Sequence, residues 1–202
     1  MRPIKRPACP IARPAQYKAY LNPLRQAFGT YCSYCERRDK LDVEHVVPTS
    51  HQPALELDWD NLLLGCPRCN RDFKKAKNQT RAGYIWPDTD DTFHAFEYLP
   101  DGRVNVAIGP MNQSAAALAD LVKLNDAAFQ AVLNLGRRDT FKIAERTLVH
   151  YQNGIANLDD VILLAQQGFW SVWLTVFAAQ PAVVSAMLDP IHFPGTARRY
   201  FP

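Results

Sequence analysis

Hydrophobic and polar positions divide the chain into an irregular start, a helical segment, a region of short strands and a helical second half. Prolines at positions 3, 7, 10 and 14 exclude a continuous helix or a central strand, so residues 1–14 are predicted to form an extended arm. In residues 17–28 apolar residues recur at intervals of three and four, which predicts a helix that Pro23 either starts or interrupts.

Short strands are predicted in the middle of the chain. Residues 41–48 and 59–64 have the composition of strands, and Pro67 is expected to begin a helix that continues to about Lys77. Residues 92–98 and 104–108 alternate on either side of a turn at residues 100–102, which predicts a β-hairpin.

From residue 114 onward the apolar positions follow a helical period. Helices are predicted at residues 114–124, 126–135, 139–152, 158–167 and 169–179. The last of these is very apolar and is expected to be buried. The segment from Phe193 to the end is too rich in turn residues to extend a helix. The pattern indicates an α+β chain with a mainly helical C-terminal region.

Length and composition add limits on the class of protein. A chain of 202 residues with 48% apolar residues is long enough for one or two domains with a real core. No charged segment followed by an apolar segment opens the chain, and the longest apolar stretch, residues 169–179, is too short to span a bilayer. We therefore expect a cytoplasmic protein that does not associate with a membrane.

Positive charge is unevenly distributed, although the net charge is only +3. Residues 1–31 contain six basic residues and no acidic residue. A second basic cluster is opposed only by Asp72, and it consists of Arg68, Arg71, Lys74, Lys75, Lys77 and Arg81. Such clusters favour a phosphate backbone as partner, although either one alone fits a solvated basic surface equally well.

Four of the five cysteines form two closely spaced pairs, and Cys9 stands alone. The pairs are Cys32-Ser-Tyr-Cys35 and Cys66-Pro-Arg-Cys69. In a reducing compartment such pairs indicate a tetrahedral zinc site in preference to disulfides. A closed four-thiolate site leaves no position for a reacting water, so zinc is expected to stabilise structure while any chemistry lies elsewhere.

The segment between the cysteine pairs contains the candidates for chemistry. Glu44 and His45 are adjacent on the first predicted strand, and Asn61 lies in the second. Asn70 and Lys74 are expected to share one face of the following helix. Hydrolysis of a phosphodiester requires a nucleophile in line, a proton acceptor and positive charge, which His45, a metal ion and the basic helix would supply. Histidine and glutamate on a strand indicate little alone, but the flanking zinc pairs and asparagines favour catalysis.

These residues resemble the HNH (ββα-metal) endonuclease family, with Glu44-His45, Asn61 and Asn70 at its three landmark positions. The resemblance implies a zinc-stapled ββα-metal motif in which Glu44 and Asn70 hold catalytic Mg²⁺ or Mn²⁺. It also implies that His45 is the general base and that Asn61 orients the histidine's loop. Glu44 replaces the more frequent aspartate and Asn70 replaces the final histidine, and both replacements keep an oxygen ligand for a hard cation.

Several stretches are more narrowly similar to HNH proteins of bacterial anti-phage systems. They are Tyr-Cys-Ser-Tyr-Cys-Glu-Arg-Arg at residues 31–38, Val-Glu-His-Val-Val-Pro at residues 43–48, Trp-Asp-Asn-Leu-Leu-Leu-Gly-Cys at residues 59–66, and Cys-Asn at residues 69–70. The nearest type is the nuclease partner of an ATPase in Septu-like and retron-linked systems. The resemblance implies a nucleic acid substrate, with DNA expected, and an ATPase partner protein.

The expected organisation has three parts. Residues 1–30 form the basic arm and helix, residues 31–80 the zinc-bound HNH motif, and residues 81–202 a hairpin and helical bundle for packing or partner docking. The expected nucleic-acid contacts are Arg71, Lys74, Lys75 and Lys77. Asp88, Asp90 and Asp91 are expected to form a solvated turn. Two alternatives remain: a zinc-ribbon binding module without catalysis, and a nuclease subunit active only within an ATPase complex.

Overall fold

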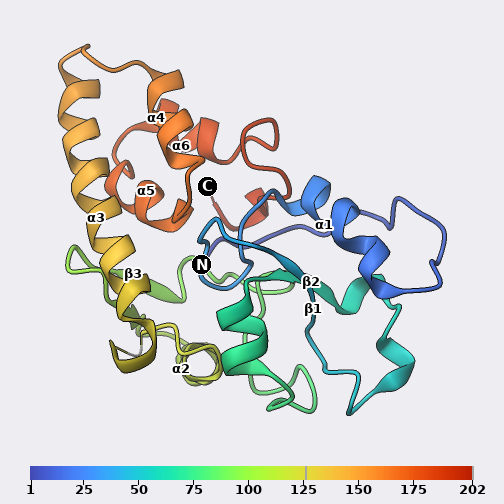
Figure 1. Ribbon diagram of the computed structural model, residues 1–202. Coiled ribbons are helices and arrows are strands. Elements are labelled where there is room, and N and C mark those ends of the chain that lie inside the picture. Colours follow the sequence, from blue (N-terminus) through green and yellow to red (C-terminus); the bar gives the residue numbers. More distant parts are fainter. Residues whose placement is uncertain (126, 202) are drawn as a thin grey trace.

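The computed structural model describes residues 1–125 and 127–201 and has a mixed α+β fold (Figure 1). The elements follow one another in this order: η1 (Tyr17–Tyr20), α1 (Leu21–Phe28), β1 (Asp42–His45), η2 (Pro53–Leu55), η3 (Trp59–Asn61), β2 (Leu62–Gly65), η4 (Arg68–Lys74), β3 (Phe96–Tyr98), β4 (Val104–Val106), α2 (Asn112–Leu121), α3 (Ala127–Gln152), α4 (Leu158–Ala165), α5 (Trp170–Val176), α6 (Pro181–Met187) and η5 (Arg198–Tyr200). None of the helices in the described residues is long and apolar enough to cross a membrane.

Both sheets are two-stranded and antiparallel. β1 pairs with β2 in a register that places Asp42 opposite Gly65 and His45 opposite Leu62. β2 is buried along its whole length, and α1 packs against this hairpin. β3 and β4 form the hairpin predicted from the alternating pattern, although each strand is shorter than expected. The expected strand at residues 59–64 begins with the 3₁₀ turn η3, and only its second half pairs with β1.

The helix after the second cysteine pair differs from the prediction. η4 is a π-helix, in which the Lys75 amide donates 2.8 Å to the carbonyl of Asn70, five residues earlier. The helix ends at Lys74, earlier than predicted, because Lys75 has a left-handed backbone with a φ of +50°. π-Helical turns are rare and often occur at functional sites.

The second half of the chain is helical, as predicted. Two helices expected at residues 126–135 and 139–152 are one continuous helix, α3, and Asp126 lies outside the described residues. At the junction of the two expected helices, Arg137 is buried and donates to the carbonyls of Gly102 and Leu124. α5 is buried against α3, as the apolar sequence indicated. α6 was not predicted.

The core joins all three expected parts of the chain, and their division remains a prediction. The main cluster of buried residues extends from Met1 and Ile4 through the β1–β2 hairpin to Phe169 and Val172. A second cluster lies among the C-terminal helices, drawn orange to red in Figure 1. The arm is irregular as expected, but residues 1–4 are buried, so its beginning is part of the packed structure.

Candidate active site

The four paired cysteines converge, as their spacing predicts. Cys32 and Cys35 follow α1, whereas Cys66 follows β2 and Cys69 lies in η4. Their sulfur atoms all lie within 4.8 Å of one another, and none of these cysteines forms a disulfide. The Sγ atoms of Cys35 and Cys66 are 3.8 Å apart. A zinc ion with bonds of about 2.3 Å gives a tetrahedral edge of about 3.8 Å, so the four thiolates fit a structural zinc ion.

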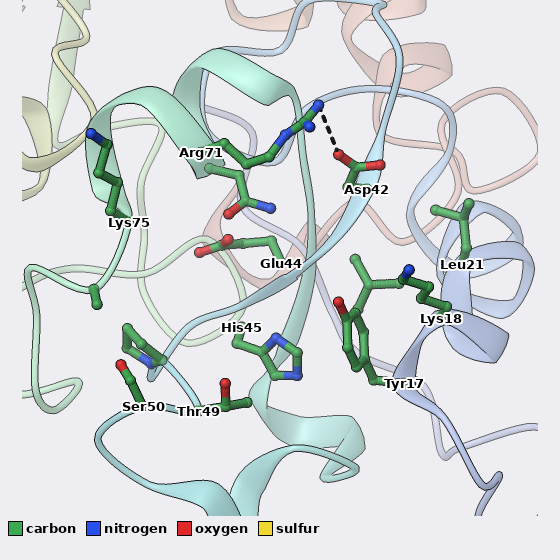
Figure 2. Close-up of a pocket in the computed structure, with 14 residues that line it drawn as sticks. Tyr17, Lys18, Leu21, Asp42, Glu44, His45, Thr49, Ser50, Arg71 and Lys75 are labelled. Carbon is green, nitrogen blue, oxygen red and sulfur yellow. Dashed lines mark ion pairs between the residues drawn. The ribbon is translucent and has the colours of Figure 1, made fainter.

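An open pocket of about 680 Å³ lies beside the β1–β2 hairpin and η4 (Figure 2). β1, η4, the loop after β1 and the start of α1 all contribute side chains. The lining consists of Tyr17, Lys18, Leu21, Asp42, Val43, Glu44, His45, Pro48, Thr49, Ser50, Asn70, Arg71, Lys75 and Ala76. Three of the four catalytic residues expected from the sequence, Glu44, His45 and Asn70, therefore face one cavity.

His45 is held at the end of β1 by contacts to both sides of its ring. Its Nε2 lies 3.0 Å from the backbone carbonyl of Glu56. A carbonyl oxygen only accepts hydrogen bonds, so the tautomer that makes this hydrogen bond has its proton on Nε2 and its free lone pair on Nδ1. The ring of Tyr17 meets His45 edge-on, with centroids 4.8 Å apart. These contacts fix the orientation of an imidazole whose Nδ1 is able to accept a proton.

Glu44 points toward η4, on the other side of the strand from His45 (Figure 2). The residue is buried, and its Oε1 accepts from the Tyr34 hydroxyl at 3.1 Å. Burial raises the pKa of the Glu44 carboxyl, while the charge of Lys74 and the hydrogen bonds from Lys74 and Tyr34 lower it by less. Within the described residues, the contacts of Lys74 and Tyr34 are both made to Oε1. Oε2 is therefore the oxygen left for a further ligand.

Lys74 is not on the surface, and its expected role in binding nucleic acid is wrong. The side chain is fully buried, and its Nζ lies 2.8 Å from Glu44 Oε1. The same ammonium donates 2.8 Å to the backbone carbonyl of His45. A buried charge requires such partners, because an unpaired ammonium in the interior is strongly unfavourable. Lys74 therefore connects the carboxylate of Glu44 to the backbone of His45.

Asn70 approaches Glu44 across a glycine. A Cβ atom placed on Gly65 would lie 3.0 Å from the Cβ of Asn70 and 3.1 Å from the Cβ of Glu44. The absence of a side chain at Gly65 thus allows the two side chains to come together at the pocket wall. Carboxylate and amide oxygens are the types of ligand that Mg²⁺ and Mn²⁺ prefer, so this pair offers suitable ligand chemistry for such an ion.

Asn61 connects β2 to the loop that follows His45. Its Oδ1 accepts from the Val47 amide at 2.8 Å, and its Nδ2 donates to the Val47 carbonyl at 2.9 Å. The side chain is buried and does not line the pocket. These two hydrogen bonds fasten the loop after His45 to the end of η3.

The segment that contains these residues is similar to known proteins. Residues 32–75 match the family model of the HNH endonucleases. This segment is therefore similar to an HNH endonuclease domain. The Septu protein PtuB of Bacillus thuringiensis is 36% identical over 81 residues, which is 36% of this chain and 31% of the relative. The match therefore spans less than a third of that relative's length.

Basic side chains border the pocket beside β1 and η4. Arg71 and Lys75 line it, as expected, and Lys18 lines the opposite wall. The Arg71 guanidinium lies 3.4 Å from the carboxylate of Asp42. Lys77 lines a separate hollow of about 370 Å³ instead, together with Arg68 and Lys123.

Several contributors to the site were not identified from the sequence. Tyr34 lies within the first cysteine pair, and burial beside Glu44 raises its pKa well above the ordinary range, so its hydroxyl remains a donor. Tyr17 lies outside the matched segment, and only its apolar spacing was noted. The Glu56 contact uses a backbone carbonyl, which every residue has, so no sequence signal distinguishes it.

Proposed function

We propose that this protein is an HNH endonuclease that hydrolyses phosphodiester bonds, with His45 as the general base. The observation that carries the proposal is the contact between His45 Nε2 and the Glu56 carbonyl, together with the position of the ring on the pocket. A proton on Nε2 satisfies this contact, and Nδ1 is then the atom that we propose removes a proton from an attacking water.

Glu44 and Asn70 are proposed to hold a catalytic Mg²⁺ or Mn²⁺ through Glu44 Oε2 and the Asn70 amide oxygen. When bound, such an ion stabilises the charge that develops on the phosphate and the leaving oxygen. Tyr34 and Lys74 occupy Glu44 Oε1 and so direct the second oxygen away from them. Asn61 orders the loop after His45, and Tyr17 restricts rotation of the imidazole.

The proposed substrate is nucleic acid, with DNA as the expected form. Lys18, Arg71 and Lys75 border the pocket and provide positive charge beside the reacting phosphate. Contacts of this kind recognise the backbone and carry no base preference. Lys77 is proposed to contact the same strand farther from the pocket.

The biological role that we propose is bacterial anti-phage defence. The similarity to a Septu protein of Bacillus thuringiensis supports this role, as does the HNH match. An ATPase partner, and activation of the nuclease within the complex, are part of this proposal.

A test of the proposed activity is incubation of the purified, zinc-loaded protein with supercoiled plasmid and Mg²⁺ or Mn²⁺. We expect nicked or linear product, and we expect omission of Mg²⁺ and Mn²⁺ to abolish it while the zinc-loaded protein still binds DNA. The alternative, a zinc-ribbon module that only binds, predicts binding without cleavage under all of these conditions. The same assay with the co-purified ATPase separates an independent nuclease from a subunit that requires its partner.

A further inference from the structure

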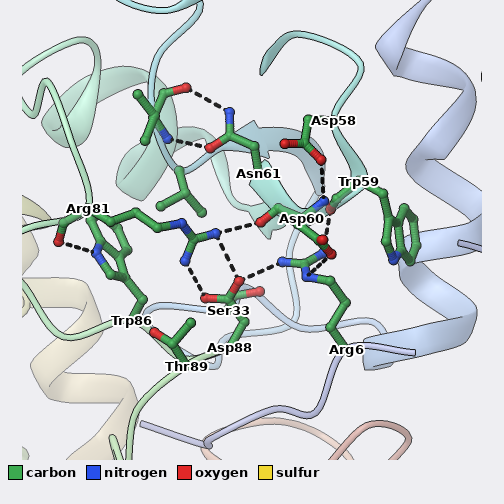
Figure 3. A network of polar contacts seen from close by, with 12 residues as sticks. Arg6, Ser33, Asp58, Trp59, Asp60, Asn61, Arg81, Trp86, Asp88 and Thr89 are labelled. Atoms are coloured by element: carbon green, nitrogen blue, oxygen red, sulfur yellow. Dashed lines mark hydrogen bonds and ion pairs between the residues drawn. The ribbon is translucent and has the colours of Figure 1, made fainter. Parts of the chain in front are cut away.

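Three charged side chains from different parts of the chain meet beside η3 (Figure 3). Asp88 is buried, and its carboxylate accepts two hydrogen bonds of 3.0 Å from the guanidinium of Arg81. Arg6 of the N-terminal arm donates to the same carboxylate at 2.8 Å. The expectation that Asp88 lies in a solvated turn is therefore wrong, because its side chain is only 3% exposed.

Each arginine also donates a hydrogen bond to a backbone carbonyl of η3. Arg6 Nη1 donates 2.7 Å to the carbonyl of Trp59, and Arg81 Nη2 donates 2.6 Å to the carbonyl of Asp60. These two carbonyls immediately precede Asn61. The Asp88 carboxylate thus joins two guanidinium groups that are hydrogen-bonded to consecutive carbonyls of η3.

The arm that supplies Arg6 is itself fixed to this turn. The indole of Trp59 donates 2.9 Å to the carbonyl of Pro7, and the Arg6 guanidinium lies 5.7 Å from the centre of the Trp59 ring. Earlier in the arm, the Ile4 amide donates 2.7 Å to the carbonyl of Pro87, beside Asp88. The side chain of Arg6 is consequently 9% exposed, unlike that of the exposed neighbour Lys5.

A short series of contacts leads from the turn to the catalytic strand. The Asn61 carbonyl accepts from the Val46 amide at 2.8 Å, and its side chain forms two hydrogen bonds with the backbone of Val47. Val46 and Val47 directly follow His45. A shift of η3 would therefore move the chain at the point where the imidazole is attached.

We propose that Arg6, Arg81 and Asp88 are positioning residues of the nuclease site, which makes the N-terminal arm a working part of the HNH domain. All three lie outside residues 32–75, the segment that matches the family. They touch neither the pocket lining nor the expected metal ligands, and they act through Asn61 on the loop after His45. The catalytic consequence rests on the proposed function, whereas the structural coupling does not.

Arginine is required at position 6 because one planar group must reach a carboxylate and a carbonyl at the same time. Lysine keeps the charge, but its one ammonium nitrogen cannot occupy the two separate positions that Nη1 and Nη2 of the planar guanidinium hold. Arg6→Lys should therefore preserve attraction to Asp88 and lose the grip on the Trp59 carbonyl. This variant separates charge from geometry in a protein expected to remain folded.

The test compares Arg6→Lys and Arg6→Met with Lys5→Met, which removes a neighbouring exposed charge from the same arm. Amide hydrogen exchange is measured at Val47 and, as a global reference, at Phe177, whose amide bonds within the C-terminal helices. Single-turnover cleavage is measured with saturating plasmid. We expect Val47 to exchange roughly tenfold faster in both Arg6 variants, with Phe177 unchanged in Arg6→Lys. Cleavage should fall roughly ten- to a hundredfold, since small misplacements have effects of this size.

The outcomes are distinguishable. Unchanged exchange at Val47 in both Arg6 variants, or faster exchange with unchanged cleavage, overturns the proposal. The proposal is also overturned if Lys5→Met changes exchange and cleavage as much as the Arg6 variants do. The loss of positive charge from the arm would then explain the effects without any positioning by Arg6. If the wild-type protein cleaves neither alone nor with the ATPase partner, the proposed function fails, and faster exchange confined to Val47 still supports the coupling from Arg6 to the loop after His45.

Discussion

The ammonium of Lys74 lies 2.8 Å from Oε1 of Glu44, and both side chains are buried. Replacing Lys74 with methionine leaves a buried carboxylate without its cation, so we expect a loss of roughly 3–5 kcal/mol in the free energy of unfolding. The double variant Glu44→Gln with Lys74→Met contains no unpaired charge and should recover part of this loss. Urea denaturation of the two single variants and the double variant measures the coupling. Wild-type stability in Lys74→Met would contradict the assignment of an ion pair.

Lys75, the next residue, is expected to behave in the opposite way. It lines the pocket, has an exposed side chain and makes no ion pair within the described residues. Lys75→Met should leave stability unchanged and weaken binding of DNA regardless of sequence. The slope of log affinity against log salt should fall by about one phosphate contact. Binding isotherms at several salt concentrations measure the slope, and an unchanged slope would show that Lys75 does not contact phosphate.

Gly65→Ala tests the placement of the proposed metal ligands. The added methyl group would press on the Cβ atoms of Glu44 and Asn70, and the backbone of Gly65 does not require glycine for its conformation. We expect the Mg²⁺ concentration for half-maximal cleavage to rise by roughly tenfold, with zinc content retained. Gly109→Ala is the matched control, because nothing lies within 4 Å of its added Cβ. If Gly65→Ala and Gly109→Ala needed the same Mg²⁺ concentration for half-maximal cleavage, Gly65 would not lie at the metal site.

Asp88 provides a prediction for stability against pH. Burial raises the pKa of its carboxyl, but hydrogen bonds and charge from Arg81 and Arg6 lower it by more, so the net shift is downward. A lowered pKa in the folded state contributes stability above the pKa of the unfolded chain, and this stability is lost as pH falls through the folded-state pKa. Asp88→Asn should therefore reduce stability at neutral pH and flatten its decrease in acid. Thermal unfolding from pH 7 to pH 3 provides the comparison, and parallel curves for the two proteins would contradict it.

The parts of the fold that depend on local spacing were predictable from the sequence. The two Cys-x-x-Cys pairs, the β3–β4 hairpin and the helical second half all follow from residues close together in the chain. The merging of two expected helices into α3 was not predictable from local spacing. Arg137, at their junction, is hydrogen-bonded to Gly102 in the β3–β4 turn and to Leu124 after α2, and such distant partners leave no local sequence pattern.

The candidate site, too, was predictable only in part from the sequence. Glu44, His45 and Asn70 were identified by their order in the chain, and the structure brings them to one pocket. The environments of Lys74 and Asp88 were misjudged, because charged residues are exposed in most proteins. Their partners come from distant segments, namely β1 for Lys74 and the N-terminal arm for Asp88. No spacing within a basic or acidic run reveals such a partner.

The most direct test of the account is the single-turnover rate of plasmid cleavage by His45→Ala with saturating Mg²⁺ or Mn²⁺. His94→Ala, which alters a histidine that does not line the pocket, is the control. We predict that His45→Ala keeps its fold, its zinc and its affinity for DNA, while the rate falls by at least about a hundredfold. A folded, zinc-loaded His45→Ala protein that cleaves at the wild-type rate would contradict the central claim that this imidazole is the general base.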